Sequence, residues 1–203
     1  MRKCLKRIGA CMLLTGLVWG FMILKDKQTL RKQMIRLHVV AASDSAEDQS
    51  LKLQVRDAVI DSLRSDLEHV VDVQQARVYL QEKLPKIENL ANQVLARSGC
   101  TDTAVVSLLE EEFPVRFYDT FTLPSGIYEA LRITIGEGEG HNWWCVVFPD
   151  LCIGGTMEDF EETAQCAGLS DSLTAALTGA GQCEVRFLVL DALGRLENFL
   201  RKG

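Results

Sequence analysis

The hydrophobic and polar positions along the chain predict an apolar N-terminal segment, two long helices and a strand-rich middle. Ile8–Leu24 is a run of 17 residues without a charge, which makes a helix of about 25 Å at ~1.5 Å per residue. Ile35–Ala41 is rich in β-branched residues and alternates in part. This pattern predicts a short strand in which Arg36 and His38 share one face.

Two stretches with helical periodicity follow that strand. Apolar residues recur at helical spacing over residues 51–67. The oxygen-bearing side chains before them suit a helix start, with Asp44 and Glu47, or Ser45 and Asp48, at capping-box spacing. We favour helix capping over calcium binding for these acidic residues, because they lack the alternating pattern of a calcium loop.

The second helical stretch runs from about Val73 to Gly99. Its apolar stripe continues on both sides of Pro85, which must end or kink the helix. Beyond Gly99 the chain changes character, and Pro and Gly separate short apolar runs. Four strands are expected there: Val105–Leu109, Arg116–Leu123, Glu129–Ile135 and Trp143–Phe148.

The last part of the chain begins with a Gly-rich, acidic stretch over residues 152–181, which we expect to wrap the surface with a short helix near Ser170–Leu177. Val185–Leu190 is expected to be a last strand and Ala192–Leu200 a terminal amphipathic helix. Together the elements predict an α+β fold, in which an N-terminal export or anchor helix precedes a single domain with a mostly antiparallel sheet and two or three long helices.

Charge divides the chain into two unequal parts. Residues 1–32 carry eight Lys or Arg and one Asp, although the whole chain has a net charge of −6. The remaining residues hold 14 basic and 27 acidic side chains, and so acidic a body repels a phosphate backbone. We therefore expect no nucleic-acid partner. With three His and no Cys-x-x-Cys pair, we expect no metal site and no cofactor either.

The basic N-terminus followed by an apolar run is typical of an export element. The run is longer than the usual apolar region of a signal peptide, and no small-x-small cleavage site precedes Lys25. A cleaved signal peptide and a signal anchor both stay open, and we prefer an uncleaved or late-cleaved anchor. Residues 1–32 are then the export or anchor segment, with residues 8–24 in the membrane, and residues 33–203 form one extracytoplasmic domain.

Five cysteines lie in the body of the chain, an odd number. Cys145 and Cys152 flank Phe148–Asp150, and an extracytoplasmic setting permits a disulfide between them. The alternative is a nucleophilic Cys145, which needs an adjacent base. His141 lies about 13 Å away along the strand at ~3.3 Å per residue, so only His38 could serve, if the fold brings it close.

Two further patterns have a structural and a functional interpretation. We interpret Gly136–Gly140 as a hairpin tip and not as a phosphate loop, because its two Glu residues repel phosphate and a strand follows it. Trp143 and Trp144 are adjacent, so they face opposite sides of their strand. At least one is expected in the core, and the other is a candidate anchor for a partner protein.

Two segments of the chain resemble the stage II sporulation protein R family. The first consists of Ile35–Ser45, Glu47–Gln49 and Leu51–Val59. The second consists of Leu123–Gly126, Tyr128–Ile133, Ile135–Gly138, Gly140, Asn142–Val146, Phe148–Pro149 and Leu151–Cys152. The resemblance covers about residues 30–155, and the apolar segment lies where the family has an export element.

The resemblance implies a signalling protein of endospore-forming bacteria. Such a protein is made in the forespore and exported across the forespore membrane into the space between forespore and mother cell. There it triggers a membrane-embedded aspartic-type protease, which cleaves the precursor of the early mother-cell sigma factor. The resemblance supplies no catalytic residue, and we expect neither an enzymatic activity nor a small-molecule substrate.

Two other functional classes stay open at this point. The first is an extracytoplasmic hydrolase that acts on cell wall or peptide through Cys145 and His38, with Asp44 as a further polar residue. The second is a structural envelope protein that binds no protease.

The two resembling segments are expected to form neighbouring strands and the start of the first long helix. This arrangement would bring together seven candidate partner-binding residues: Arg36, His38, Asp44, Arg56, Arg132, Asn142 and Trp143. The functional interpretation of the cluster is a recognition surface with a Trp at its centre. The structural alternative is an ion-pair network, since buried charges need partners. In that network Arg56 or Arg132 would pair with Asp44, Asp57 or Glu129.

Overall fold

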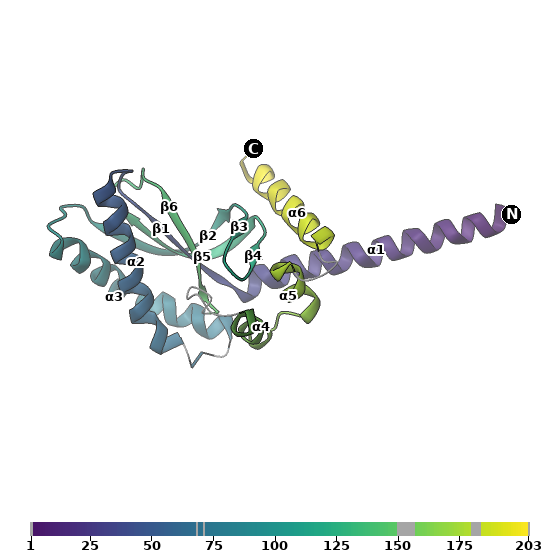
Figure 1. Ribbon diagram of the computed structural model, residues 1–203, viewed down its shortest axis with the longest axis horizontal. Coiled ribbons are helices and arrows are strands. Elements are labelled where there is room, and N and C mark those ends of the chain that lie inside the picture. The colour runs from purple at the N-terminus through teal and green to yellow at the C-terminus, as the bar shows by residue number, and fades with distance from the viewer. Residues whose placement is uncertain (1, 68, 71, 150–156, 180–183, 203) are drawn as a thin grey trace.

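The structure is a computed structural model that describes residues 2–67, 69–70, 72–149, 157–179 and 184–202 (Figure 1). Its helices are α1 (Arg2–Gln33), α2 (Ala46–Leu67), α3 (Val73–Arg97), α4 (Met157–Cys166), α5 (Asp171–Thr178) and α6 (Glu184–Lys202). Its strands are β1 (Ile35–Val40), β2 (Ala104–Phe113), β3 (Arg116–Phe117), β4 (Thr122–Leu123), β5 (Gly126–Ile135) and β6 (Asn142–Phe148).

Four strands form one mixed sheet in the order β2-β5-β1-β6. β1 is parallel to β5 and antiparallel to β6, while β2 is antiparallel to β5. The sheet is therefore mostly antiparallel, and the predicted α+β class is confirmed. All six residues of β1 are buried, as expected for a strand with a neighbour on each side and elements covering both faces.

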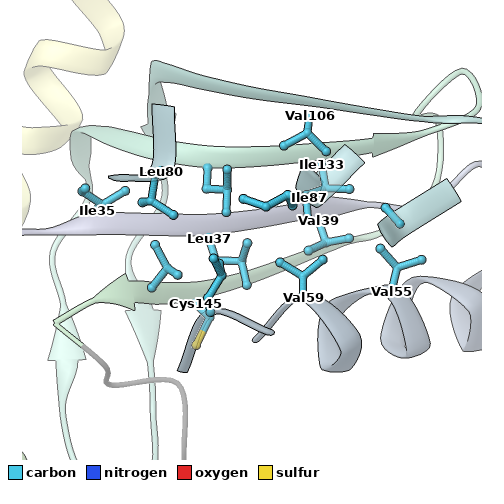
Figure 2. Close-up of a cluster of buried hydrophobic side chains, with 14 of the residues drawn as sticks. Ile35, Leu37, Val39, Val55, Val59, Leu80, Ile87, Val106, Ile133 and Cys145 are labelled. Carbon is cyan, nitrogen blue, oxygen red and sulfur yellow. The ribbon is translucent and has the colours of Figure 1, made fainter. Parts of the chain in front are cut away.

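Two hydrophobic cores lie on opposite faces of this sheet. On one face α2 and α3 pack against Leu37 and Val39 of β1, with Val55 and Val59 of α2 among the buried residues (Figure 2). On the other face α1, α4, α5 and α6 surround a second core that includes Phe113. Residues 36 and 38 point into this second face because side chains alternate along a strand.

The long helix α1 has two different halves. Its N-terminal half extends away from the domain (Figure 1), and most of its apolar residues from Ile8 to Leu24 are exposed. Arg7–Gln33 is long and apolar enough to cross a membrane. Its C-terminal half packs on the domain, where Ile23 and Leu30 are buried in the second core.

Local signals set the ends of α2 and α3. The Ser45 hydroxyl accepts a hydrogen bond from the backbone N–H of Asp48 (3.1 Å), so the Ser45–Asp48 version of the predicted cap is the one that forms. Pro85 lies inside α3 and does not end it. The helix continues because buried residues on both sides of the proline, Leu80 and Ile87, hold it against the sheet.

Two strand predictions are wrong. Val185–Leu190 is helical and belongs to α6, because Phe187, Leu190 and Asp191 lie at helical spacing and face the domain. The expected strand Arg116–Leu123 is instead a pair of two-residue strands, β3 and β4. The short helix predicted near residues 170–177 is present as α5.

Candidate functional site

His38 lies at the centre of a group of polar and aromatic side chains on the second face of the sheet. Its Nδ1 is 2.8 Å from Glu111 Oε1, and its Nε2 is 2.8 Å from Asn142 Oδ1. Its ring stacks on Trp144, and the side chain is almost completely buried. Both ring nitrogens are engaged, so the imidazole is held in place.

Glu111 connects this group to the protein surface. Besides His38, its carboxylate accepts a hydrogen bond from Arg132 Nη1 (3.3 Å). Arg132 Nε donates to the hydroxyl of Thr134 (3.2 Å), and the Arg132 side chain is 37% exposed. The group therefore draws on all four strands of the sheet and reaches solvent at Arg132.

Arg36 is fully buried one step along the same face of β1. Its guanidinium lies over the rings of Phe113 (4.1 Å to the centroid) and Tyr128 (5.1 Å), and Nη2 donates to the hydroxyl of Tyr118 (2.6 Å). Its Nε and Nη1 are buried without a hydrogen-bond partner, and no ion pair joins it to a carboxylate of the described residues. Cation–π contact offsets only part of the cost of burying such a charge.

Arg116 is a second guanidinium beside the same aromatic residues. It lies 5.3 Å from the ring centroid of Trp144, and its Nε is also buried without a partner. Burial, together with the nearby positive charge of Arg36, holds the pKa of Arg116 below its usual value. Two incompletely paired guanidiniums that repel each other form a place that favours a carboxylate from another molecule.

We call this set of residues the Trp144 face: Arg36, His38, Glu111, Arg116, Arg132, Asn142 and Trp144. It carries three arginines against one glutamate on a domain that is strongly acidic. The imbalance of charge is local, and it is opposite in sign to the rest of the domain.

Trp143 points to the opposite side of the sheet, as the alternation of residues 143 and 144 predicts. Arg56 of α2 covers its ring at 4.2 Å, and Trp143 remains 38% exposed. Arg56 Nε also donates to Asp57 Oδ1 (2.8 Å). Trp143 and Arg56 thus form a separate surface pair.

Asp44 lies at the end of the sheet, where the two resembling segments are joined. Its Oδ1 accepts a hydrogen bond from the backbone N–H of His141 (2.6 Å) and contacts the His141 ring. Hydrogen bonding from the His141 backbone lowers the pKa of Asp44. Lys52 Nζ donates to the carbonyl of His141 (3.0 Å), and burial lowers the pKa of Lys52.

The Gly-rich loop 136–141 is not a hairpin tip, which corrects our expectation. Its flanking strands β5 and β6 do not pair with each other, because β1 lies between them. The loop crosses the end of β1, and Gly140 N–H donates to the carbonyl of Ala41 (3.0 Å). A side chain at position 140 would overlap the Ser43 carbonyl, so glycine is required for this close approach.

The predicted cluster is therefore divided. The two segments do form neighbouring strands, β1 with β5 and β6, and Arg36, His38, Arg132 and Asn142 lie together. Arg56 and Trp143 lie on the other face, and Asp44 lies at the end of the sheet. Of the expected ion pairs only Arg56–Asp57 forms. Glu129 pairs with Arg77 of α3 and Arg132 pairs with Glu111.

Sequence reasoning missed Glu111, Arg116 and Tyr118. The expected strand ended at Leu109, two residues before Glu111, whereas β2 continues to Phe113. Alternation along the longer strand β2 places Glu111 on the same face as Phe113. The two-residue spacing between Glu111 and Phe113 was the signal in the sequence that could have placed Glu111 on this face.

Cys145 is disulfide-bonded, and it lies on the face of the sheet that carries Leu37. His38 projects to the other face, so the two residues form no nucleophile–base pair. Cys152, the predicted disulfide partner, lies outside the described residues, and that pairing stays a prediction. Within the described ranges no group of three or more His, Cys, Asp or Glu could hold a metal ion.

Comparison with known proteins identifies the family. The sequence pattern of stage II sporulation protein R matches residues 31–158. The chain belongs to the stage II sporulation protein R family. Stage II sporulation protein R of Bacillus subtilis (strain 168) is 39% identical over 120 residues, which cover 59% of this chain. The chain spans about half (54%) of that relative's length. No solved structure matches.

The family match covers a defined part of the structure. Residues 31–158 include β1 to β6, α2 and α3, and therefore every residue of the Trp144 face. They leave out α5, α6, most of α4 and nearly all of α1. Membership of this family supports a role in sporulation.

Proposed function

We propose that this chain is an exported signalling protein that activates a membrane-embedded aspartic-type protease of the mother cell, leading to processing of the early mother-cell sigma factor precursor. Membership of the stage II sporulation protein R family supports the sporulation role. The proposal needs no catalytic residue in this chain. It needs only that the domain bind the active state of the protease more tightly than the inactive state.

The proposed location is the space between the forespore and mother-cell membranes. The exposed apolar half of α1 supports export and anchoring of the chain in the forespore membrane. We propose that α1 is retained as the anchor, because Ile23, near the end of the apolar run, is buried in the second core and would be lost by cleavage after the run. Residues 33–203 then form a single extracytoplasmic domain facing the mother cell.

The observation that carries the proposed partner binding is the pair of buried, incompletely hydrogen-bonded guanidiniums of Arg36 and Arg116 beside Trp144. A fold gains little from two such charges, since buried cations without anions are costly. A carboxylate on the extracytoplasmic surface of the protease would supply an acceptor to Arg116, which is half-buried, while the fully buried Arg36 adds positive charge close by. Arg132 and Asn142 lie at the exposed rim of this face, where a partner can reach them first.

The test is precursor processing in a bacterial host that makes only this chain, the protease and the sigma factor precursor. Arg132→Ala should lower processing by about tenfold or more, as expected for an interface anchor worth about 1.4 kcal/mol. The matched control is Arg64→Ala, which removes an exposed arginine of α2 and should leave processing unchanged. Thermal unfolding of both variants should resemble that of the wild type. Normal processing by Arg132→Ala, or a loss that follows its thermal stability, would refute the Trp144 face as the binding surface.

A further inference from the structure

The C-terminal helix α6 has an apolar stripe on the side that faces away from the domain. Six apolar residues at helical spacing are exposed along it: Val185, Leu188, Ala192, Leu196, Phe199 and Leu200. The stripe runs for about 22 Å, given ~1.5 Å per residue. A contiguous apolar surface of this length on an exported domain indicates a partner.

The fold does not need this stripe. The opposite side of α6 already holds the helix to the domain through Leu190, Asp191 and Gly194. Asp191 accepts hydrogen bonds from the backbone N–H (2.9 Å) and the hydroxyl (2.6 Å) of Ser125. α6 thus has an inner side that packs on the domain and an outer apolar stripe that is exposed in the described structure.

α6 begins beside the end of the apolar segment of α1. Arg186, in its first turn, donates from Nε to Asp26 Oδ2 (2.7 Å), and Asp26 follows Leu24, the last apolar residue of the segment, by two positions. Lys27 Nζ donates to the carbonyl of Leu193 (3.2 Å) and pairs with Glu197 (2.7 Å). Figure 1 shows α6 leaving α1 where the long helix enters the domain. Arg31 Nη1 also donates to Glu197 Oε1 (3.4 Å). The contacts therefore place the start of α6 within about one helical turn, and Glu197 within about two turns, of the point where α1 would leave the hydrocarbon.

We propose that α6 lies in the membrane interface, with its outward stripe among the lipids that surround α1. Only a lipid surface is already adjacent to the stripe when α1 spans the membrane, so this inference rests on the anchoring of α1 and not on recognition of the protease. Amphipathic helices bind in this way, with the apolar side at the boundary of headgroups and acyl chains. The two helices would hold the sheet at a defined height above the membrane.

The test uses the full chain reconstituted in phosphatidylcholine vesicles, without any protease. Phe199→Trp and Leu188→Trp each add one indole to the stripe, and Val78→Trp adds one at another exposed position, on α3. Tryptophan emission is compared between vesicles of ordinary and of brominated phosphatidylcholine. The signal of the wild type, which includes Trp19 of α1, is subtracted from each variant.

Emission added at positions 188 and 199 should be shifted to shorter wavelength and quenched by brominated lipid at least about twofold more than emission added at position 78. Equal quenching at the three positions would overturn the proposal. A shift to shorter wavelength without quenching would also overturn it, because a second copy of the chain would then cover the stripe. Since no protease is present, failure here is distinguishable from failure of the Trp144 face in precursor processing.

Discussion

The imidazole of His38 stacks on the indole of Trp144, with ring centroids 3.7 Å apart and planes inclined by 14°. The two residues are direct partners in the register of β1 and β6. One comes from each of the two segments that resemble the family, so the stack joins residues that lie far apart in the sequence. Trp144 also meets Phe113 edge to face and lies 5.3 Å from Arg116.

The first prediction concerns this stack. His38→Ala should lower the free energy of unfolding by about 2–4 kcal/mol, because it removes a buried ring and leaves Glu111 with one fewer hydrogen-bond donor. Denaturant unfolding monitored by fluorescence measures the change. His69→Ala, at an exposed position in the loop before α3, is the control and should be neutral. A loss below about 0.5 kcal/mol for His38→Ala would show that the stack does not stabilise the fold.

The second prediction separates stability from signalling at Arg36. Arg36→Met replaces a buried guanidinium by an apolar side chain that can fill much of its space, so the stability should change by less than about 1 kcal/mol or increase. Arg36→Ala should cost about 3 kcal/mol through the cavity that it leaves.

Precursor processing should nevertheless fall with Arg36→Met, because the positive charge that Arg36 adds beside the half-buried Arg116 is gone. If Arg36→Met processes normally while it folds normally, the guanidinium has no part in recognition.

The third prediction concerns the close approach of the Gly-rich loop to the chain after β1. Gly140→Ala should destabilise the domain by about 2 kcal/mol or more, because the added methyl group overlaps the Ser43 carbonyl. Gly126→Ala is a suitable comparison, since its new methyl group meets only the Tyr128 ring at 3.4 Å. Thermal unfolding of the two variants should differ by several degrees. Equal midpoints would mean that the loop can move away from β1 without cost.

The fourth prediction concerns acid stability. Hydrogen bonding from the His141 backbone lowers the pKa of Asp44 below 3.8. The contribution of the ionised Asp44 to the free energy of unfolding is therefore present above about pH 4 and is lost as the pH falls through the lowered pKa. The midpoint of thermal unfolding should therefore fall less steeply below pH 4 for Asp44→Asn than for the wild type. Asp61→Asn, which removes a surface carboxylate of α2, should follow the wild-type curve. Parallel curves for Asp44→Asn and the wild type would show that protonation of Asp44 does not cause the loss of stability in acid.

Properties that depend on local sequence were predictable. The apolar run of α1, a helix cap within residues 44–48, the strand β1 and the opposite directions of Trp143 and Trp144 all follow from composition and from the helical or strand period. These signals are contained in a few consecutive residues, so no knowledge of the rest of the fold was needed. The two resembling segments also indicated correctly that their strands would be neighbours.

The tertiary structure decided what depends on pairing between distant strands. The order β2-β5-β1-β6 places β1 between β5 and β6, which turns an apparent hairpin loop into a crossing over the end of β1. It also brings Glu111 to His38 and separates Trp143 from Arg36. Likewise, residues 185–190 have β-branched character, but they form a helix because α1 and β5 offer a surface that only helical spacing can cover. Strand order and helix docking are set by the burial of whole faces, and no local pattern encodes them.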